Sequence, residues 1–426
     1  MTNLEYIIDF SVHYAKELIE AGTNIERVNY NIARVLNAYN LEDVSMHLLS
    51  TFISLSARDN EGNYCQRQIK IEQSLDLDLE KMKNLNRLSH IIAKEKCEPI
   101  KLKEMLHEVE DKKYPIWVTL IAYFITVLCI GRMFNGGIPE LLIIEVNTFI
   151  IYGLGLLSDK IKLNKMISSF ISMFIVVSIA LLSTRIGFTT NHYSIIIVNS
   201  LFLFPGIPLV NAARNILCGN EMNGVIELLK ILLNVLIICA GIGLAFYFFD
   251  KGLPTLEESI VDRDPRDFFS SLELIILSFF ASLGLGVAFN INIKDVLFAG
   301  LGGAIIRTVY ILFQIIVPYT LAYTIMSSFI AALYSEIIAI SKKEPSTLYL
   351  YPSIIPIIPG GLFYYSSLGI IWQNSALFNE YAPELLLALS GISAGFVLCS
   401  SFVYYIRKFK FKAIFEPKKK IVINKK

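Results

Sequence analysis

Two short stretches rich in proline and glycine interrupt apolar segments of this 426-residue chain. The first stretch contains Pro205, Gly206 and Pro208, and the second contains Pro356, Pro359, Gly360 and Gly361. Proline removes an amide donor and clashes with the preceding turn, and glycine leaves helical geometry at little cost. Each stretch therefore predicts a broken helix whose free amides could bind a carboxylate and whose free carbonyls could bind an ammonium group. A plain proline kink would explain either stretch taken alone.

Polar residues that follow each break could belong to the same binding site. They are Asn211, Arg214 and Asn215 after the first break, and Tyr364 and Ser366 after the second. Amides and hydroxyls offer the donors and acceptors that a small polar solute requires. Arg214 could equally be a positively charged anchor at a membrane surface, and Tyr364 could be a packing residue with a hydrogen-bonded tip.

Ionisable residues inside apolar segments include Glu145, Arg307 and Glu336. Charged groups in such positions are costly and point to a proton or substrate pathway. Glu145 could instead form a hydrogen-bonded pair with Asn147 beside it that only holds two helices together. Glu336 lies nearer a predicted helix end, where a long side chain can reach the surface.

The sequence gives little support for a metal site, an enzyme active site or a nucleic-acid-binding surface. The six cysteines are scattered without a CxxC pair, and the five histidines are isolated, so we expect no metal site, no disulfide framework and no cofactor. No nucleophile–base arrangement is recognisable, which argues against an enzyme. A formal net charge of +1 provides no basic field for nucleic acid.

The composition indicates a polytopic α-helical membrane protein. The chain is 54% hydrophobic and 18% charged, with a mean hydropathy of +0.56, whereas a soluble domain carries about 25% charged residues.

Polar residues 1–114 predict a small α+β domain. A first helix is expected there within residues 1–22, ending near Gly22, and a second over 24–39. Strands within 44–56 and 68–72 around a turn at 59–62 follow, and then helices over 77–94 and 101–109.

About ten spans are expected beyond residue 114, because a bilayer core needs roughly 20 apolar residues per helix. They fall near 116–133, 139–157, 166–184, 193–213, 224–249, 269–289, 295–317, 319–340, 348–371 and 383–406. We therefore divide the chain into a domain over 1–114, a membrane repeat over 115–250, a second repeat over 251–407 and a basic tail over 408–426.

Loop charges predict the orientation. With the amino-terminal domain in the cytoplasm, the short loops and the tail place 16 Lys and Arg residues inside and five outside. Both termini are then cytoplasmic, as an even number of spans requires. No cleaved signal peptide is indicated at the amino terminus. We expect a multi-pass protein of the plasma membrane.

The two breaks occupy matching positions in the two halves. Gly241 follows Pro205 by 36 residues, and Gly395 follows Pro359 by the same number. This spacing indicates a five-span unit used twice. Because five is odd, the second copy must cross the membrane in the opposite sense, which is the inverted repeat typical of alternating-access transporters.

Three stretches carry a resemblance to a known family. PGIPLVNAARNILCGNEMNG (205–224) and IIPIIPGGLFYYSSLG (354–369) resemble the two membrane signatures of the threonine/serine exporter family, and ELIEAGTNIERVNYNIARVLNAY (17–39) resembles the opening of its soluble domain. The resemblance implies export of small amino acids driven by the proton gradient. Similar sequences often have an aspartate where this chain has Asn215, so a proton-carrying role of that carboxylate does not transfer.

The prediction is a secondary active exporter of threonine and serine. Its partners would be the amino-acid substrate, protons and the lipid bilayer. Nucleic acid is not expected as a partner, and the chain could form a homo-oligomer. An ion channel or passive pore is one alternative. A membrane-anchored hydrolase with residues 1–114 catalytic is the other.

Overall fold

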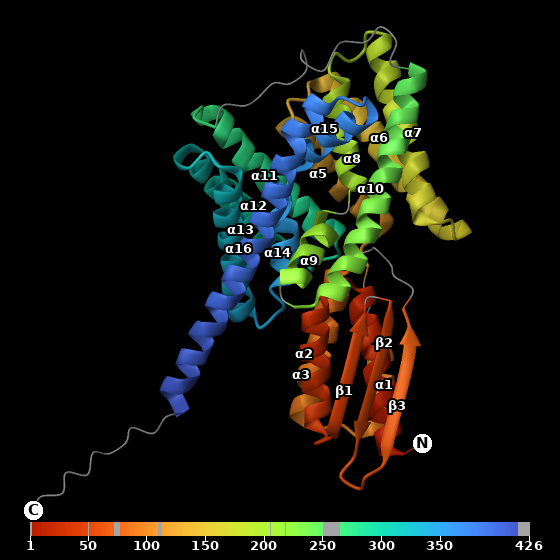
Figure 1. The fold of residues 1–426 in the computed structure, drawn as a ribbon, viewed down its shortest axis with the longest axis vertical. Coiled ribbons are helices and arrows are strands. Elements are labelled where there is room, and N and C mark those ends of the chain that lie inside the picture. The colour runs from red at the N-terminus through yellow and green to blue at the C-terminus, as the bar shows by residue number, and fades with distance from the viewer. Residues whose placement is uncertain are drawn as a thin grey trace, which may run out of the picture.

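The computed structural model describes residues 2–49, 51–71, 77–109, 113–204, 206–217, 219–249 and 265–415. Pro205, most of the acidic loop after residue 249 and the end of the basic tail from 416 onward lie outside the described residues. An amino-terminal domain lies against one end of a larger helical body (Figure 1). We call that end of the helical body the domain side and the opposite end the far side.

The amino-terminal domain combines helices with one antiparallel sheet. Its helices are α1 (Asn3–Glu20), α2 (Ile25–Ala38), α3 (Leu79–Glu95), η1 (Pro99–Lys101) and α4 (Leu102–His107). Thr2 and Glu5 form a capping box at the start of α1. Gly22 has a φ of +88°, which glycine adopts without strain, and Asn24 caps α2. These local signals fix the helical pair that the sequence predicts.

The sheet has the order β1-β2-β3 among the described residues, with β1 (Glu42–Leu49), β2 (Phe52–Arg58) and β3 (Tyr64–Lys70). The predicted strand region 44–56 is thus two strands, because β1 and β2 pair antiparallel with Leu49 opposite Phe52. The expected turn joins β2 to β3, and Asp59 accepts hydrogen bonds there from the amides of Glu61 and Asn63. Ile53, Leu55 and Ala57 of β2 are buried in the domain core.

The helical body contains every apolar helix of the chain's described part. Its helices are α5 (Ile116–Met133), α6 (Ile138–Ile161), α7 (Lys165–Arg185), α8 (His192–Leu203), α9 (Gly206–Leu217), α10 (Glu221–Phe249), α11 (Phe268–Ala288), α12 (Ile293–Ile316), α13 (Thr320–Lys342), α14 (Thr347–Ile354), η3 (Ile355–Ile357), α15 (Gly360–Ile371) and α16 (Ser375–Phe415). Among the described residues, eight helices are long and apolar enough to cross a membrane. Two bent pairs raise the number to ten when each counts as one span.

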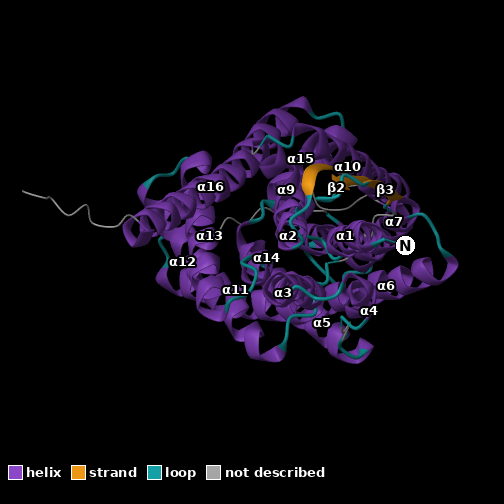
Figure 2. Ribbon diagram, turned by 90° about the horizontal axis from the view of Figure 1, so that it is seen from below, coloured by secondary structure: helices purple, strands orange, loops and turns teal. Residues whose placement is uncertain are grey.

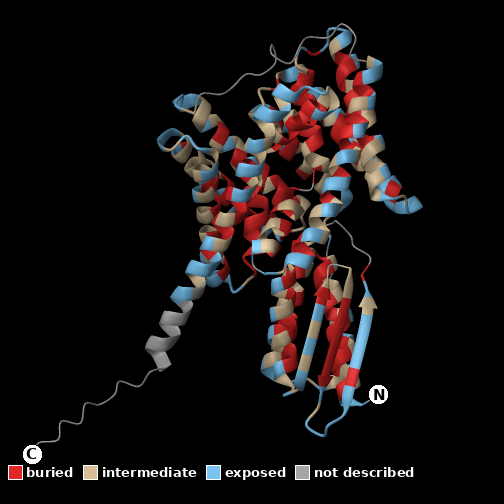
Figure 3. Cartoon of the chain, viewed as in Figure 1, coloured by how far each residue is buried: buried red, intermediate tan, exposed pale blue. Residues whose placement is uncertain are grey.

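The outer surface of this body is itself apolar. Trp117, Tyr247 and Phe269 are all more than 60% exposed, whereas the buried residues lie toward the middle of the body (Figure 3). A water-soluble protein rarely exposes so much contiguous apolar surface. The surface therefore suits contact with lipid.

The second half of the body repeats the first in its helix positions. Each of α11, α12, α13, α14, α15 and α16 begins between 152 and 155 residues after its counterpart among α5, α6, α7, α8, α9 and α10. Helices α9 and α15 have 12 residues each, and α6 and α12 have 24 each.

The same helix pairs also pack together in both halves. Helix α7 packs against α10, as α13 packs against α16. Two glycines at matching positions allow this close packing: a Cβ at Gly241 would meet the carbonyl of Phe170 on α7, and one at Gly395 would meet the carbonyl of Ile325 on α13. Each helix pair can approach closely because these positions lack a side chain.

The predicted spans agree with the helices except at the last one. Helix α16 runs over Ser375–Phe415, well beyond the expected 383–406. The Asn374 side chain accepts hydrogen bonds from the amides of Ala376 and Leu377 and so caps its start. Toward its end no glycine or proline interrupts the sequence before Pro417, so the helix continues into the predicted basic tail.

Candidate functional site

Both proline–glycine stretches bend the chain sharply. Helices α8 and α9 meet at 54°, and the pair formed by α14–η3 and α15 meets at 56°. The amide of Gly206 donates to the carbonyl of Phe204, and that of Gly360 donates to the carbonyl of Ile358, each over 2.8 Å. Pro359, with φ −80° and ψ 60°, forms the centre of an inverse γ-turn. The helical hydrogen-bond ladder is therefore interrupted at the same place in both halves.

The two breaks contact each other. The rings of Phe204 and Phe363 lie 4.1 Å apart between centroids. A Cβ on Gly206 would lie 3.1 Å from Ile358 Cδ1, and one on Gly360 would overlap the side chain of Leu201. Each break thus uses its glycine to admit a side chain that precedes the other break, and neither segment is a continuous helix facing lipid.

A cavity of about 1010 Å³ lies between the breaks. Phe204, Gly206, Ile207 and Pro208 line it from the first stretch, and the residues from Ile355 to Leu362 line it from the second. Polar side chains from neighbouring helices also line it, among them Tyr123, Thr126, Tyr193, Asn234, Arg307, Tyr310, Gln314 and Tyr323. The cavity also extends to Leu77 and Phe289 at the domain side and to Pro265 and Glu380 at the far side.

Side chains from neighbouring helices bind carbonyls freed by the breaks. Arg307 Nη1 on α12 donates to the carbonyl of Pro356 over 3.0 Å, and Asn234 Nδ2 on α10 donates to the carbonyl of Leu203 over 3.4 Å. The guanidinium of Arg307 also lies over the ring of Tyr310, 5.3 Å from its centroid. An unpaired backbone carbonyl in an apolar environment costs several kcal/mol. These contacts explain how the broken geometry persists.

The arrangement can recognise a small zwitterion. Helices α9 and α15 begin at the breaks, so the partial positive charge of each amino-terminal end faces the cavity region. Arg307 adds a full positive charge beside the second break. Carbonyl oxygens of the unwound residues are the natural partners of an ammonium group.

The predicted site residues fall into separate groups. Cavity-lining residues among them are Gly206, Pro208, Arg307, Pro356, Pro359, Gly360 and Gly361. Tyr364 is fully buried in the helical body, 6.5 Å from the ring of Tyr193, and the hydroxyl of Ser366 donates to the carbonyl of Leu362 in its own helix. Neither of these two lines the cavity. Pro205 lies outside the described residues.

The polar residues of α9 lie between the cavity and the domain side. Asn211 Nδ2 donates to the hydroxyl of Tyr351 on α14 over 3.1 Å, a contact between the two halves. Asn215 Nδ2 lies 3.1 Å from Glu227 Oε2 on α10. Arg214 pairs with Glu26 of the amino-terminal domain at 3.4 Å. Sequence reasoning did not foresee these partners: Tyr351 and Glu26 are 140 and 188 positions away, and Glu227 lies on the next helix, 12 positions away.

The two carboxylates predicted for a proton pathway, Glu145 and Glu336, lie away from the cavity lining. Both carboxylate oxygens of Glu145 on α6 are buried without a hydrogen-bond partner among the described residues. The neighbouring Asn147 bonds instead to Asn199 on α8, with Nδ2 3.0 Å from Oδ1. Glu336 on α13 is half-buried and interacts electrostatically with Arg27 of the amino-terminal domain. Glu336 therefore belongs to the domain side.

Asn234 is one of the cavity residues that sequence reasoning missed. It is buried, lines the cavity and holds the Leu203 carbonyl. Asn234 could have been predicted from the sequence, because it is an amide in the middle of the apolar run ILLNVLIICAG. Tyr310, Gln314 and Tyr323 were missed for a different reason, since their side chains are common in packed spans.

A second, smaller cavity of about 210 Å³ lies in the amino-terminal domain between α1, α3 and α4. Asp9, His13, Glu17, Lys81 and Lys103 line it together with apolar residues and His107. The lining includes no serine, threonine or cysteine. Across the described ranges, no group of three or more His, Cys, Asp or Glu side chains could hold a metal ion.

Two family models match the chain in consecutive order. A model described as a threonine/serine exporter, ThrE, matches residues 9–249, and a second one with the same description, ThrE_2, matches residues 274–402. Comparisons with curated proteins and with solved structures gave no match. The first matched range ends just before the acidic loop, and the second covers the repeated half with the second break.

Proposed function

The chain belongs to the threonine/serine exporter family, and on this premise we propose that it exports threonine and serine by secondary active transport. The family resemblance predicted from the sequence is confirmed. The chain is a multi-pass membrane protein, and its family indicates a transporter rather than an enzyme. The substrate, the site and the mechanism are our proposal.

One observation carries the proposed site: both breaks meet on one cavity that also contains Arg307. The substrate carboxylate would bind near the amino-terminal ends of α9 and α15 and the guanidinium of Arg307. Its ammonium group would bind carbonyls of the unwound residues. The small hydroxyl side chain of serine or threonine would reach polar lining residues such as Asn234 and Thr126.

Alternating access would arise from the two repeats rocking around this site. The matching helix positions and the repeated helix pairs support a duplicated unit. The direction of the half-helices supports inversion: α8 lies on the far side and α9 nearer the amino-terminal domain, whereas α14 lies nearer the domain and α15 on the far side (Figure 1). The Asn211–Tyr351 contact would open when the halves separate at the domain side.

Proton coupling would run through a glutamate of the spans. Glu145 supports it, because a buried carboxylate without a hydrogen-bond partner is costly unless it takes up a proton. Asn215 cannot carry a proton, and its contact with Glu227 leaves that carboxylate as a second candidate. We therefore place the proton on a glutamate of the spans and not on α9.

The location follows from loop charges. We propose that the amino-terminal domain and the carboxyl terminus lie in the cytoplasm and that the protein resides in the plasma membrane. The excess of Lys and Arg in the loops on the domain side supports this orientation. Export would then run from the domain side to the far side.

Flux in proteoliposomes tests the function. Vesicles loaded with radiolabelled threonine or serine should release it through the purified protein, saturably and faster when a proton gradient is imposed. Alanine and glycine serve as further substrates. Absence of gradient-dependent flux for all four would contradict the proposal, and unsaturable conductance would favour the channel alternative.

A further inference from the structure

The amino-terminal domain reaches the cavity between the breaks. Leu77, just ahead of α3, lines this cavity together with Phe289 at the end of α11. The amide of Leu79 donates to the carbonyl of Phe289 over 3.1 Å, and Asn290 Nδ2 lies 3.3 Å from Asp78 Oδ1. The domain is therefore bonded to the rim of the cavity.

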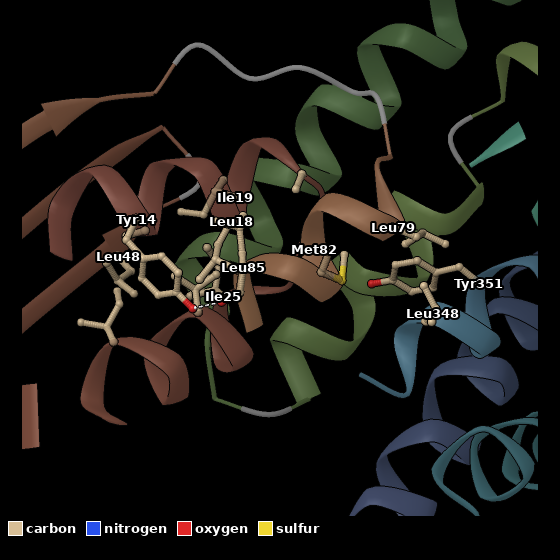
Figure 4. Close-up of a cluster of buried hydrophobic side chains, with 14 of the residues drawn as sticks. Tyr14, Leu18, Ile19, Ile25, Leu48, Leu79, Met82, Leu85, Leu348 and Tyr351 are labelled. Atoms are coloured by element: carbon tan, nitrogen blue, oxygen red, sulfur yellow. Dashed lines mark hydrogen bonds between the residues drawn. The ribbon is translucent and has the colours of Figure 1, made fainter. Parts of the chain in front are cut away.

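An apolar cluster joins the domain to the helical body. Leu79 and Met82 of α3 belong to the same buried cluster as Leu348 and Tyr351 of α14, and the side chains lie side by side in Figure 4. The hydroxyl of Thr347 also donates to Met82 Sδ over 3.1 Å. Seen from below, α1, α2 and α3 lie over the middle of the ring of helices (Figure 2). The domain thus covers the end of the body toward which the cavity runs.

Charged residues at this junction form an interdomain ion cluster of Glu80, Lys83, Asp295, Lys342 and Glu344. Lys83 Nζ lies 2.9 Å from Glu344 Oε1 and 3.0 Å from Asp295 Oδ2, and Lys342 Nζ lies 3.0 Å from Asp295 Oδ1. The side chains of Lys83, Glu344 and Asp295 are only 19%, 15% and 6% exposed. Removing Lys83 would leave the nearly buried Glu344 without this positive partner and Asp295 with Lys342 alone.

Lys83 carries its charge in this position. Burial disfavours the charged form, but the hydrogen bonds to Glu344 and Asp295 outweigh burial and raise the pKa of Lys83 above its ordinary value. The ammonium group therefore stays protonated at neutral pH.

The domain contacts both halves of the helical body, at α9 just after the first break and at the start of α14, which precedes the second break. Arg214 on α9 pairs with Glu26, and Arg27 Nη2 donates to Ser346 Oγ, just before α14, over 3.3 Å. Glu344 in turn accepts a hydrogen bond from the hydroxyl of Tyr349 on α14. A displacement of the domain would release α9 and α14 together.

We propose that the amino-terminal domain is the gate of the cavity on its side and that it must move away from the helical body in every transport cycle. The interdomain ion cluster and the apolar cluster hold the closed position. The inference rests on the proposed function in one respect only, namely that the cavity holds the transported solute.

Cross-linking tests whether the domain must move. The substitutions Arg27→Cys and Ser346→Cys are introduced into a variant that lacks the native cysteines. A reducible bifunctional thiol reagent about as long as the arginine side chain then cross-links the two new thiols. We expect linked protein to transport threonine or serine at least about tenfold more slowly than the same protein after reduction. If the cross-linked protein transports at a rate within about twofold of the reduced protein, the proposal that the domain must move is wrong.

Cavity labelling tests the gate without transport. Ile207→Cys places a thiol in the cavity lining, and a membrane-impermeant thiol reagent is presented from the domain side. Lys83→Met should raise the labelling rate about fivefold or more, whereas Lys103→Met should leave it unchanged because Lys103 Nζ is near Asp9 within the domain. Equal rates in Lys83→Met and the parent would overturn the proposal. A labelling difference without flux of any amino acid would support the gate and refute the exporter function.

Discussion

Arg307 Nη1 lies 3.0 Å from the carbonyl oxygen of Pro356, the residue at which the second membrane break begins. The donor belongs to α12 and the acceptor to the unwound segment before α15, so the contact fixes the break to a neighbouring span. The same guanidinium lines the cavity. Arg307 therefore combines two roles in our proposal, since it stabilises a carbonyl freed by the break and offers positive charge to a substrate carboxylate.

Arg307→Ala should reduce threonine and serine flux about tenfold or more, because a hydrogen bond from a charged donor contributes about 1.5–3 kcal/mol. Arg307→Lys should retain part of the flux, since it keeps the charge but not the planar donor pair. Flux in proteoliposomes at equal protein content measures both. Arg185→Ala is the matched control, because Arg185 is exposed at the end of α7. Equal flux in Arg307→Ala and Arg185→Ala would refute the role of Arg307.

Glu145→Gln should separate transport from the proton gradient. The substitution keeps the shape of the side chain but removes the proton that the buried carboxylate can exchange. We expect substrate exchange at equal pH on both sides to persist, while stimulation by an imposed pH gradient falls below about twofold. Both are measured by counterflow and by gradient-driven efflux from the same vesicles. Full gradient stimulation in Glu145→Gln would show that the coupling proton lies elsewhere.

The sequence predicted the spans better than the contacts between them. Helix α5 has the expected limits 116 and 133 because an apolar run is flanked there by polar residues. The Pro359–Gly360 break was predictable for a local reason, since both residues disfavour a continuous helix. The pairing of Lys83 with Asp295 was not, because the two residues are 212 positions apart and an isolated lysine looks like any surface lysine. Features that depend on neighbouring residues can be predicted from the sequence, whereas contacts between distant residues depend on how the helices pack in the folded protein.

The contact between Asn211 and Tyr351 can be measured by a double-mutant cycle. Nδ2 of Asn211 lies 3.1 Å from the hydroxyl of Tyr351, and the residues belong to different halves. Asn211→Ala and Tyr351→Phe should each lower the melting temperature. The loss in the free energy of unfolding of the double variant should be smaller than the sum of the two single losses by about 0.5–1.5 kcal/mol. Thermal unfolding in detergent gives the values. Strict additivity would mean that the hydrogen bond does not join the halves in solution.

Gly360→Ala should impair the protein more than Gly206→Ala. A methyl group at Gly360 would overlap the side chain of Leu201, including Cγ at 2.7 Å, whereas one at Gly206 would lie 3.1 Å from the flexible end of Ile358. Overpacking of this kind costs about 1–3 kcal/mol, so Gly360→Ala should lose thermal stability and most of its flux, and Gly206→Ala should lose less of both.

Gly153→Ala and Gly155→Ala are the matched controls for these substitutions. Both glycines lie within α6, and a Cβ at either would meet no atom within 4 Å. Alanine is favoured over glycine inside a helix by about 1 kcal/mol, so these variants should match or exceed the parent in melting temperature and retain its flux. If Gly360→Ala behaved like them, Leu201 would have room to move aside, and the close fit between the two breaks would not limit transport. If all four variants lost flux equally, the loss would reflect glycine replacement in general rather than the contact between the breaks.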